Sequence, residues 1–476
     1  MRLVLVSPPY VAEYMRNGRC DYLSWSHTQW YPIWLAYCGA LLVKHGHSVL
    51  FIDAPAEEIS LEETLKRVVE AQPKAVIVYG STMSLDSDVC FAEQVKEKTL
   101  AQVIFAGPYV SIDPAAVLAA SLSIDAVVRG EFEYPVLEIA EGKPFEEVQN
   151  LIWRRGKDSI SNQMRPALTS SQLDELPFVT DFYRRHLNLK HYRVPSEWYP
   201  FVDLFTGRGC LWGHCLFCLW PHVFTKGSCY ATRSVDNVLE ELRWIRKSMP
   251  QVRQVFFQDD ALSVPRAVEL STAMLSVGLN LPWGCYVRGN LDADTLGLMR
   301  RAGCRTLHVG YESGNDQVLK NSVKGVNRQE MSEFTSRAHS AGLRIHGDFL
   351  FGLPGDTIET IRETIAWAKE LNPETAQFLI PRLYPKTPLY EYLAHNGFIK
   401  DGQPNYPLLS TAQILKLVRE AYLGFYCRPA FLKKVIFEPQ EYIFPRFEAI
   451  GRMIHRLVFS PRHSSNLGSS CPKKIP

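Results

Sequence analysis

Three cysteines stand close together near the middle of the chain. Cys210, Cys215 and Cys218 lie within the twelve-residue segment GRGCLWGHCLFC. Thiolates are soft ligands that suit iron–sulfur clusters and zinc. Three of them can hold three irons of a 4Fe–4S cluster, which leaves the fourth iron open to a substrate or cofactor. The spacing therefore predicts a metal centre at these three residues.

A structural zinc site is the alternative to an iron–sulfur cluster. Its fourth ligand would be His214, His222 or Cys229. Structural zinc sites usually combine two paired ligand knuckles, and no second knuckle follows this segment. The other cysteines are scattered singly, unlike the dense cysteines of a secreted disulfide scaffold, which indicates a reducing compartment.

The composition limits the class of protein. With 476 residues, of which 46% are hydrophobic and 21% charged, the chain is long enough for about three domains with a sizeable core. Its formal net charge of +2 argues against a nucleic-acid partner, which requires a concentrated basic surface. No apolar run reaches the roughly 18 residues of a membrane span, and the N-terminus lacks the features of a signal peptide. We therefore expect a soluble, cytoplasmic protein.

Strands and helices alternate over the first 140 residues. This alternation predicts a parallel sheet, whose ligands bind at the carboxyl ends of the strands. The expected strands are Arg2–Val6, Ser48–Ile52, Ala75–Tyr79, Gln102–Phe105 and Asp125–Val128, and the expected helices are Tyr31–His45, Leu61–Ala71 and Asp86–Lys98.

The periodicity weakens over residues 146–200 and returns afterwards. We interpret 1–145 as a first domain, 146–200 as a linker with a hairpin at Ile152–Asn162, 201–400 as a second α/β domain and 401–476 as a helical region. The expected strands of the second domain are Phe201–Phe205, Val255–Phe257, Thr306–Val309 and Phe349–Phe351. Its expected helices are Val235–Ser248, Leu296–Ala302, Arg328–Ala341 and Thr360–Leu371.

The cysteine segment resembles that of the radical S-adenosylmethionine (SAM) superfamily, in the branch with an N-terminal cobalamin-binding domain. The resemblance covers roughly residues 1–400. The motif of that family is Cys-x3-Cys-x2-Cys with an aromatic residue before the last cysteine, which is Phe217 here. This chain departs from it by one residue, because four residues separate Cys210 from Cys215.

Further landmarks of the family follow in the expected order. The resemblance implies SAM contacts at residues that each follow an expected strand: Gln258, Asp259, Asp260, Glu312, Ser313, Gly352 and Gly355. The segment Tyr384–Tyr390 resembles the part that closes the family's partial barrel. The resemblance thus implies a partial (β/α)6 barrel, of the TIM type, that holds a 4Fe–4S cluster and cleaves SAM to a 5′-deoxyadenosyl radical, with no catalytic residues beyond the cluster ligands.

The first domain resembles the Rossmann- or flavodoxin-like cobalamin domain of this branch. The resemblance implies cobalamin contacts at the small turns and strand ends formed by Ser7, Pro8, Ser81, Thr82, Gly107, Gly130 and Glu131. No Asp-x-His-x-x-Gly motif occurs, so no histidine is marked as a lower cobalt ligand. The alternative is a flavodoxin-like domain without its cofactor. Cys20, Cys38 and Cys90 also admit a second cluster of the RNA methylthiotransferase kind, but three unrelated thiols explain them better.

Two reactions fit this resemblance. One is methyl transfer from methylcobalamin to an unactivated carbon, and the other is a radical rearrangement. Four segments resemble the hopanoid-biosynthesis subgroup: Trp30–Ala36, Leu176–Asp181, Cys218–Pro221 and Gly310–Asn315. The expected partners are a small-molecule or lipid substrate and a reductant such as flavodoxin or ferredoxin.

Two alternatives stay open. The basic and apolar stretch Arg446–Val458 either lies on an anionic membrane or packs as a helix on the barrel, and packing is the simpler expectation. A non-catalytic zinc or iron–sulfur module is the alternative to an enzyme, although such a module would not need a barrel of about 200 residues.

Overall fold

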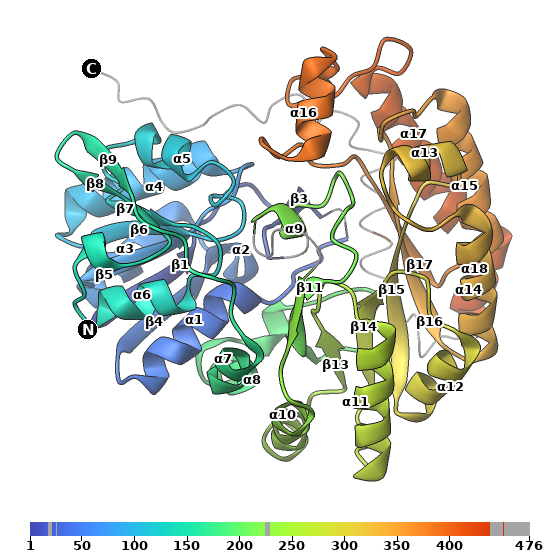
Figure 1. Cartoon of the computed structure of the whole chain (residues 1–476), viewed down its shortest axis with the longest axis horizontal. Helices are drawn as coiled ribbons and strands as arrows, with labels where there is room; N and C mark the ends of the chain where they lie inside the picture. Colours follow the sequence, from blue (N-terminus) through green and yellow to red (C-terminus); the bar gives the residue numbers. More distant parts are fainter. Residues whose placement is uncertain (18–20, 25, 224–228, 438–450, 452–476) are drawn as a thin grey trace. The chain divides into compact units, whose positions relative to one another are not determined.

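A computed structural model describes residues 1–17, 21–24, 26–223, 229–437 and 451. The chain divides into two compact units, and the division falls between Tyr192 and Arg193. Each unit is built around its own parallel sheet (Figure 1).

The sheet of the first unit has five parallel strands in the order β4-β1-β5-β6-β7. Numbered along the chain, this order is 2-1-3-4-5, the flavodoxin-like arrangement, so the expected fold of this domain is confirmed. The strands are β1 (Arg2–Ser7), β4 (Ser48–Asp53), β5 (Ala75–Tyr79), β6 (Gln102–Ala106) and β7 (Ala126–Val128).

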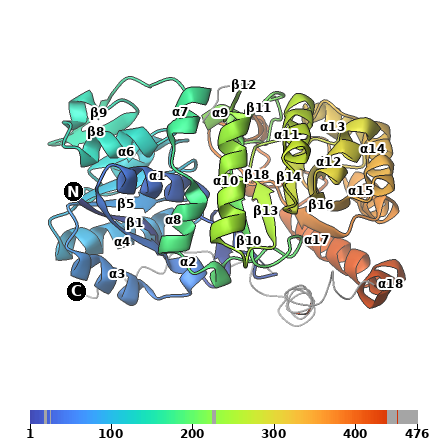
Figure 2. The ribbon, with the colours of Figure 1, turned by 90° about the horizontal axis from the view of Figure 1, so that it is seen from below.

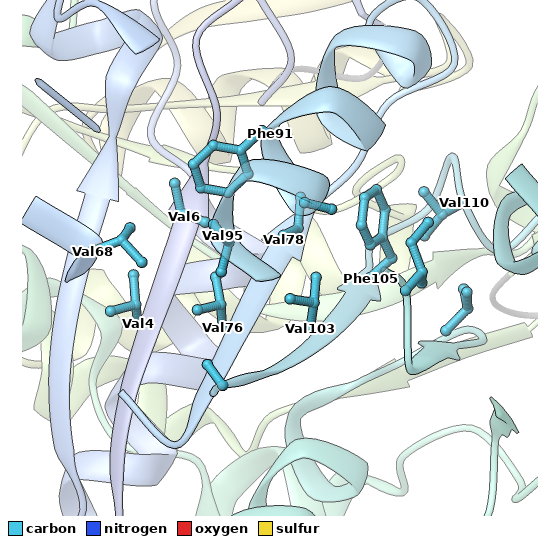
Figure 3. Close-up of a cluster of buried hydrophobic side chains, with 14 of the residues drawn as sticks. Val4, Val6, Val68, Val76, Val78, Phe91, Val95, Val103, Phe105 and Val110 are labelled. Atoms are coloured by element: carbon cyan, nitrogen blue, oxygen red, sulfur yellow. The ribbon is translucent and has the colours of Figure 1, made fainter. Parts of the chain in front are cut away.

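Helices connect these strands and cover a valine-rich core (Figure 3). Val4, Val76 and Val103 from three neighbouring strands are fully buried beside Phe91 and Val95 of α4. The β-branched residues suit a sheet that is buried on both faces, as parallel sheets are. The helices are α1 (Ile33–Lys44), α2 (Ala54–Glu57), α3 (Leu61–Ala71), α4 (Leu85–Lys98), α5 (Pro114–Ala120) and α6 (Glu133–Ala140).

The segment expected to be a linker is largely structured. Strands β8 (Leu151–Arg155) and β9 (Asp158–Ser161) form the expected hairpin, and β8 pairs antiparallel with β7, so the hairpin extends the first sheet. Helices α7 (Ser170–Glu175) and α8 (Val179–His186) follow within the same unit. The weak periodicity reflects short elements, and the domain boundaries proposed from the sequence stay a prediction.

The second unit contains a six-stranded parallel sheet in the order β10-β13-β14-β15-β16-β17. Strands that are adjacent in this sheet also follow one another along the chain, which is the arrangement expected of a partial barrel. The strands are β10 (Phe201–Leu204), β13 (Gln254–Phe257), β14 (Trp283–Val287), β15 (Cys304–Glu312), β16 (Arg344–Leu350) and β17 (Thr375–Leu379).

The helices between these strands lie along one face of the sheet (Figure 2). That face is apolar: Leu307, Ile345, Phe349 and Phe378 are almost completely buried. The alternate positions of the strands carry polar side chains, which points the polar face towards the inside of the partial barrel. The helices are α10 (Val235–Ser248), α11 (Val264–Ser276), α12 (Ala293–Arg301), α13 (Asp316–Asn321), α14 (Arg328–Ser340) and α15 (Ile358–Leu371).

Helices also follow the sheet, as expected for the C-terminal region: α16 (Pro388–His395), α17 (Thr411–Tyr426) and α18 (Pro429–Phe437). The Tyr426 hydroxyl of α17 donates to the Ala376 carbonyl oxygen of β17 at 2.7 Å. The stretch 446–458, for which membrane contact was considered, lies outside the described residues apart from position 451. Within the described ranges, we find no helix with the length and apolarity required to span a bilayer.

Candidate functional site

The three cysteines lie on and beyond a small hairpin that follows β10. Strand β11 (Gly207–Cys210) pairs antiparallel with β12 (Cys229–Thr232), so that Cys210 is opposite Cys229. Cys215 and Cys218 follow in the connecting loop, ahead of α9 (Trp220–Val223). All three thiols are partly exposed, and Phe217 between the last two is also partly exposed.

The donor set fits an iron–sulfur cluster, because three accessible thiols share one loop after the first strand of the barrel. In the described part of the chain, no three side chains of His, Cys, Asp or Glu are already arranged around one metal position. The loop therefore brings the three cysteines into one neighbourhood without converging their sulfur atoms.

A turn at residues 322–325 holds the cysteine loop. The Trp212 Nε1 donates to the Val323 carbonyl oxygen at 2.9 Å, and the Leu216 amide donates to the Ser322 carbonyl oxygen at 3.2 Å. Gly325 has a φ of +71°, and a Cβ at that position would overlap the Trp212 ring. Only glycine combines this left-handed backbone with so close an approach.

We expect Gly325→Ala to weaken this attachment. The substitution adds left-handed strain and a clash with Trp212, which together cost about 1–3 kcal/mol. Thermal unfolding and iron uptake after reconstitution measure the effect, with Gly278→Ala as control. Gly278 also has a positive φ, of +62°, but a Cβ there would meet open space. Equal iron uptake by both variants would show that the turn does not hold the loop.

A buried ion pair lies beside the same turn. The Lys324 Nζ contacts the Glu312 Oε1 at 2.9 Å, and both side chains are less than a tenth exposed. Burial raises the pKa of Glu312, an effect that Lys324 opposes. Burial lowers the pKa of Lys324, but the charge of Glu312 outweighs this and the net shift is upward. A Cβ on Gly310 would overlap the Glu312 carboxylate. The glycine therefore leaves the space that the ion pair occupies.

The residues that follow β13 have different surroundings. The Asp259 carboxylate is fully buried and accepts from the Thr206 amide and hydroxyl, both at 2.6 Å, and from the Tyr230 hydroxyl at 2.5 Å. The Gln258 Nε2 donates to the Asp203 Oδ2 at 3.0 Å. Asp260 is partly exposed. Asp259 therefore ties the end of β10 and the cysteine hairpin to β13.

The predicted residues after β15 and β16 also have protein partners. The Ser313 hydroxyl is buried 3.3 Å from the Thr364 Oγ1. The amides of Gly352 and Leu353 donate to one oxygen of Asp356, at 2.8 and 2.9 Å. Gly352 and Gly355 both have positive φ values, of +100° and +93°, and Gly355 is exposed. These two glycines form a turn at the carboxyl end of β16.

In the first unit, the residues predicted to contact cobalamin lie at the carboxyl edge of the sheet. The Ser81 hydroxyl is fully buried and bonded to Tyr14 and to Asp21, and Thr82 is partly exposed. Gly107, with a φ of +120°, lies so close to Tyr79 that a Cβ would be 2.9 Å from its ring. The other residues predicted to contact cobalamin are buried: Ser7, Pro8, Gly130 and Glu131. The Glu131 Oε2 accepts a hydrogen bond from the Leu168 amide at 2.7 Å.

Some buried oxygens of the first unit have no hydrogen-bond partner among the described residues. They include the Ser7 Oγ at the end of β1 and the Asp53 Oδ1 at the end of β4. Unpartnered buried polar atoms are rare, and they mark places where a polar ligand or water completes the bonding. The carboxyl edge of the sheet therefore fits a large polar cofactor such as cobalamin, in agreement with the usual ligand position in this fold.

Asp53 gives the first unit a measurable pH dependence. Burial, and then the charge of Glu57, raise its pKa from 3.8 to about 7, although Tyr192 and Asn17 bond its Oδ2 at 3.2 Å each. The folded state thus keeps a proton that the unfolded state releases, so the stabilisation is complete below about pH 4 and is lost as the pH rises to about 7.

We expect Asp53→Asn to remove this dependence. The variant should melt several degrees above the wild type at pH 8 and close to it at pH 4, because the amide never ionises. Thermal unfolding at the two pH values measures the difference, with the exposed Glu58→Gln as control. An equal offset at both pH values would contradict the raised pKa.

Several residues of these sites escaped the sequence analysis: Trp212, Arg288, Lys324 and Gly325 around the cysteine loop, and Arg16, Asp21 and Asp88 in the first unit. Arg16 is fully buried, and its two Nη atoms bond the carbonyl oxygens of Tyr79 and Pro8 and pair with Asp88. Arg288 directly follows β14, a strand that the sequence analysis did not predict, so its position gave no signal. The others lie on turns whose partners are remote in sequence.

Comparison with protein families assigns each unit. Residues 204–368 match the radical SAM superfamily, and residues 21–140 match the B12 binding domain. The first match begins at the last residue of β10 and runs through the cysteine loop and strands β13 to β16 into α15. The second match spans most of the flavodoxin-like unit.

Similar proteins share this combination along most of their length. An uncharacterized methyltransferase of Pyrococcus horikoshii is 29% identical over 435 residues, which cover 87% of this chain and 92% of that protein. A cytidylyl-2-hydroxyethylphosphonate methyltransferase of Streptomyces wedmorensis is 26% identical and covers 79% and 80% of the two chains.

A solved structure has the same fold. TsrM from Kitasatospora setae, a radical SAM methyltransferase determined with cobalamin and a [4Fe-4S] cluster, aligns with a TM-score of 0.65 at 19% identity. The alignment covers 87% of this chain and 80% of TsrM. The domains imply an enzyme with three cofactors, a 4Fe–4S cluster, SAM and cobalamin. The chain is therefore a radical SAM protein in which a B12-binding domain precedes the radical SAM domain.

Proposed function

We propose that this enzyme transfers a methyl group to an unactivated carbon of a small molecule, with SAM and cobalamin as cofactors. The observation that carries the proposal is the union, in one chain, of a cobalamin-type domain with a barrel that presents three partly exposed thiols on one loop. The two similar proteins described above are named as methyltransferases, and one of them is matched over 92% of its length, whereas other relatives are named anaerobic magnesium-protoporphyrin IX monomethyl ester cyclases.

Cys210, Cys215 and Cys218 would hold the cluster, and the residues at the carboxyl ends of β13, β15 and β16 would hold SAM. The cluster supplies the electron that cleaves SAM to a carbon-centred radical, while cobalamin supplies the methyl group. The chain's own contribution is to position these groups and to exclude water. We assign Gln258, Asp260 and Glu312 to that role, although in this structure Gln258 bonds Asp203 and Glu312 pairs with Lys324.

The carboxyl edge of the first sheet would hold cobalamin. Ser7 and Asp53 offer unpartnered buried oxygens there, and Gly107 and Gly130 form turns with positive φ values. The sequence marks no histidine ligand for the cobalt, so we expect cobalamin to bind without one.

Radical rearrangement without methyl transfer is the second candidate, and the resemblance to the hopanoid subgroup stays a prediction. The names of the similar proteins favour methyl transfer. A flavodoxin or ferredoxin is the reductant that we expect.

Labelled SAM tests the proposal before the substrate is known. The protein is reconstituted with iron, sulfide and cobalamin without oxygen, reduced, and incubated with SAM whose methyl group carries deuterium. We expect 5′-deoxyadenosine to form and the deuterated methyl group to appear on cobalamin, as measured by mass spectrometry. Formation of 5′-deoxyadenosine without label on cobalamin would favour rearrangement, and absence of both would contradict the proposed function.

A further inference from the structure

Arg288 is placed directly against the cysteine loop. It follows β14 at the carboxyl edge of the second sheet, and its guanidinium lies 4.5 Å from the centre of the Trp212 ring. Trp212 stands between Cys210 and Cys215 in the loop. Stacking of an arginine on an indole is attractive and strongest where water is excluded, so the contact fixes the guanidinium beside the loop.

The other side of Arg288 is anchored to the turn that holds the loop. Its Nη2 donates to the Lys324 carbonyl oxygen at 2.6 Å. The same turn also accepts hydrogen bonds from Trp212 and Leu216 of the loop. Arg288, the turn and the loop therefore form one connected structure, in which the guanidinium has little freedom to move away.

Two positively charged side chains, Lys324 and Arg288, act on the Cys215 thiol, and they differ in whether a carboxylate neutralises them. Lys324 is paired with the Glu312 carboxylate at 2.9 Å, which neutralises most of its field. Arg288 has no carboxylate within 4.0 Å among the described residues. Burial lowers the pKa of Arg288, and the charges that oppose this are those of Cys215 and Cys210. Of the two described positive charges that act on Cys215, Arg288 is thus the one without a carboxylate partner.

We propose that Arg288 is a positioning residue that raises the reduction potential of the cluster bound by Cys210, Cys215 and Cys218. This inference rests on the proposed function. One electron from an external reductant makes the thiolate-bound centre more negative by one unit, and a fixed positive charge stabilises that form over the oxidised one. For two unit charges on the order of 10 Å apart at an effective dielectric constant of about 20, such an interaction corresponds to about a tenfold change in the ratio of the two forms.

Redox titration followed by electron paramagnetic resonance tests the proposal on the reconstituted full chain. In Arg288→Gln, the ratio of reduced to oxidised cluster at the wild-type midpoint should fall about tenfold, which is a shift of about 59 mV for a one-electron couple. Arg288→Lys keeps the charge and should restore most of the potential. Lys320→Met is the matched control, because it removes an exposed charge four residues before Lys324.

The outcomes separate a charge effect from a packing effect. An unchanged potential in Arg288→Gln, or an equal fall in Arg288→Gln and Arg288→Lys, would overturn the proposal. If Arg288→Gln takes up no iron and Arg288→Lys takes up a full cluster, the charge is needed for assembly, which supports it. Equal loss of the cluster in both variants overturns it. A wild-type protein without a cluster would instead contradict the proposed function, and this inference with it.

Discussion

Replacing any one of Cys210, Cys215 or Cys218 by alanine is expected to abolish cleavage of SAM. A cluster held by two thiolates lacks a protein ligand for one of its three protein-bound irons, so it should not assemble stably. We expect iron content to fall to near background and 5′-deoxyadenosine formation to fall by at least about a thousandfold. Iron analysis and chromatography of the reaction products measure the two effects.

Two other cysteines provide controls for this experiment. Cys229→Ala removes the thiol opposite Cys210 in the hairpin, which is also a candidate fourth ligand of a zinc site. Cys427→Ala removes an exposed free thiol at the end of α17. Both variants should retain the cluster and the activity. Activity that survives the loss of Cys210, Cys215 or Cys218 would contradict the mechanism, and zinc that is lost in Cys229→Ala but retained in Cys427→Ala would identify a zinc site.

Substitution of Asp259 by alanine is expected to produce the largest loss of stability in the second unit. The change leaves three buried donors without an acceptor, the amide and hydroxyl of Thr206 and the hydroxyl of Tyr230. At about 1–3 kcal/mol for each unsatisfied group, we expect a loss of about 5 kcal/mol. Urea unfolding of the apoprotein measures it.

The neighbouring Asp260 distinguishes this role from SAM binding. The resemblance to the radical SAM family implies that both aspartates contact SAM, but only Asp259 is fully buried and bonded within the protein. Asp260→Ala should weaken SAM binding and leave the unfolding curve nearly unchanged. An Asp259→Ala variant that unfolds like the wild type and fails only in SAM binding would contradict the structural role.

Elements with a clear period could be predicted from the sequence almost to the residue. Helices Leu61–Ala71 and Val235–Ser248 match α3 and α10, because serine N-caps and one-sided apolar stripes mark their bounds. Strands β14 and β17 were missed. Trp283–Val287 and Thr375–Leu379 contain Gly284, Cys285 and Gln377, which interrupt the apolar run that marked the other strands.

The candidate sites show the same limit. The cysteine triplet is local in sequence, and the structure places it after β10 as predicted. The partners of the loop are distant, since Trp212 meets residues more than a hundred positions later. Asp259 and Ser313 occupy predicted positions but bond within the protein, and only the folded structure reveals that their oxygens are used. Spacing identifies the residue types of a site, whereas packing decides which of them face a ligand.

Metal analysis of the purified protein tests the central claim most directly. The protein is purified without oxygen and supplied with cobalamin, and its iron, sulfide, zinc and cobalt contents are determined together with a visible spectrum. We predict about four irons and one corrin per chain, with absorption bands of both cofactors. Zinc alone, with no cluster after reconstitution, would contradict the assignment of Cys210, Cys215 and Cys218 as a radical SAM centre.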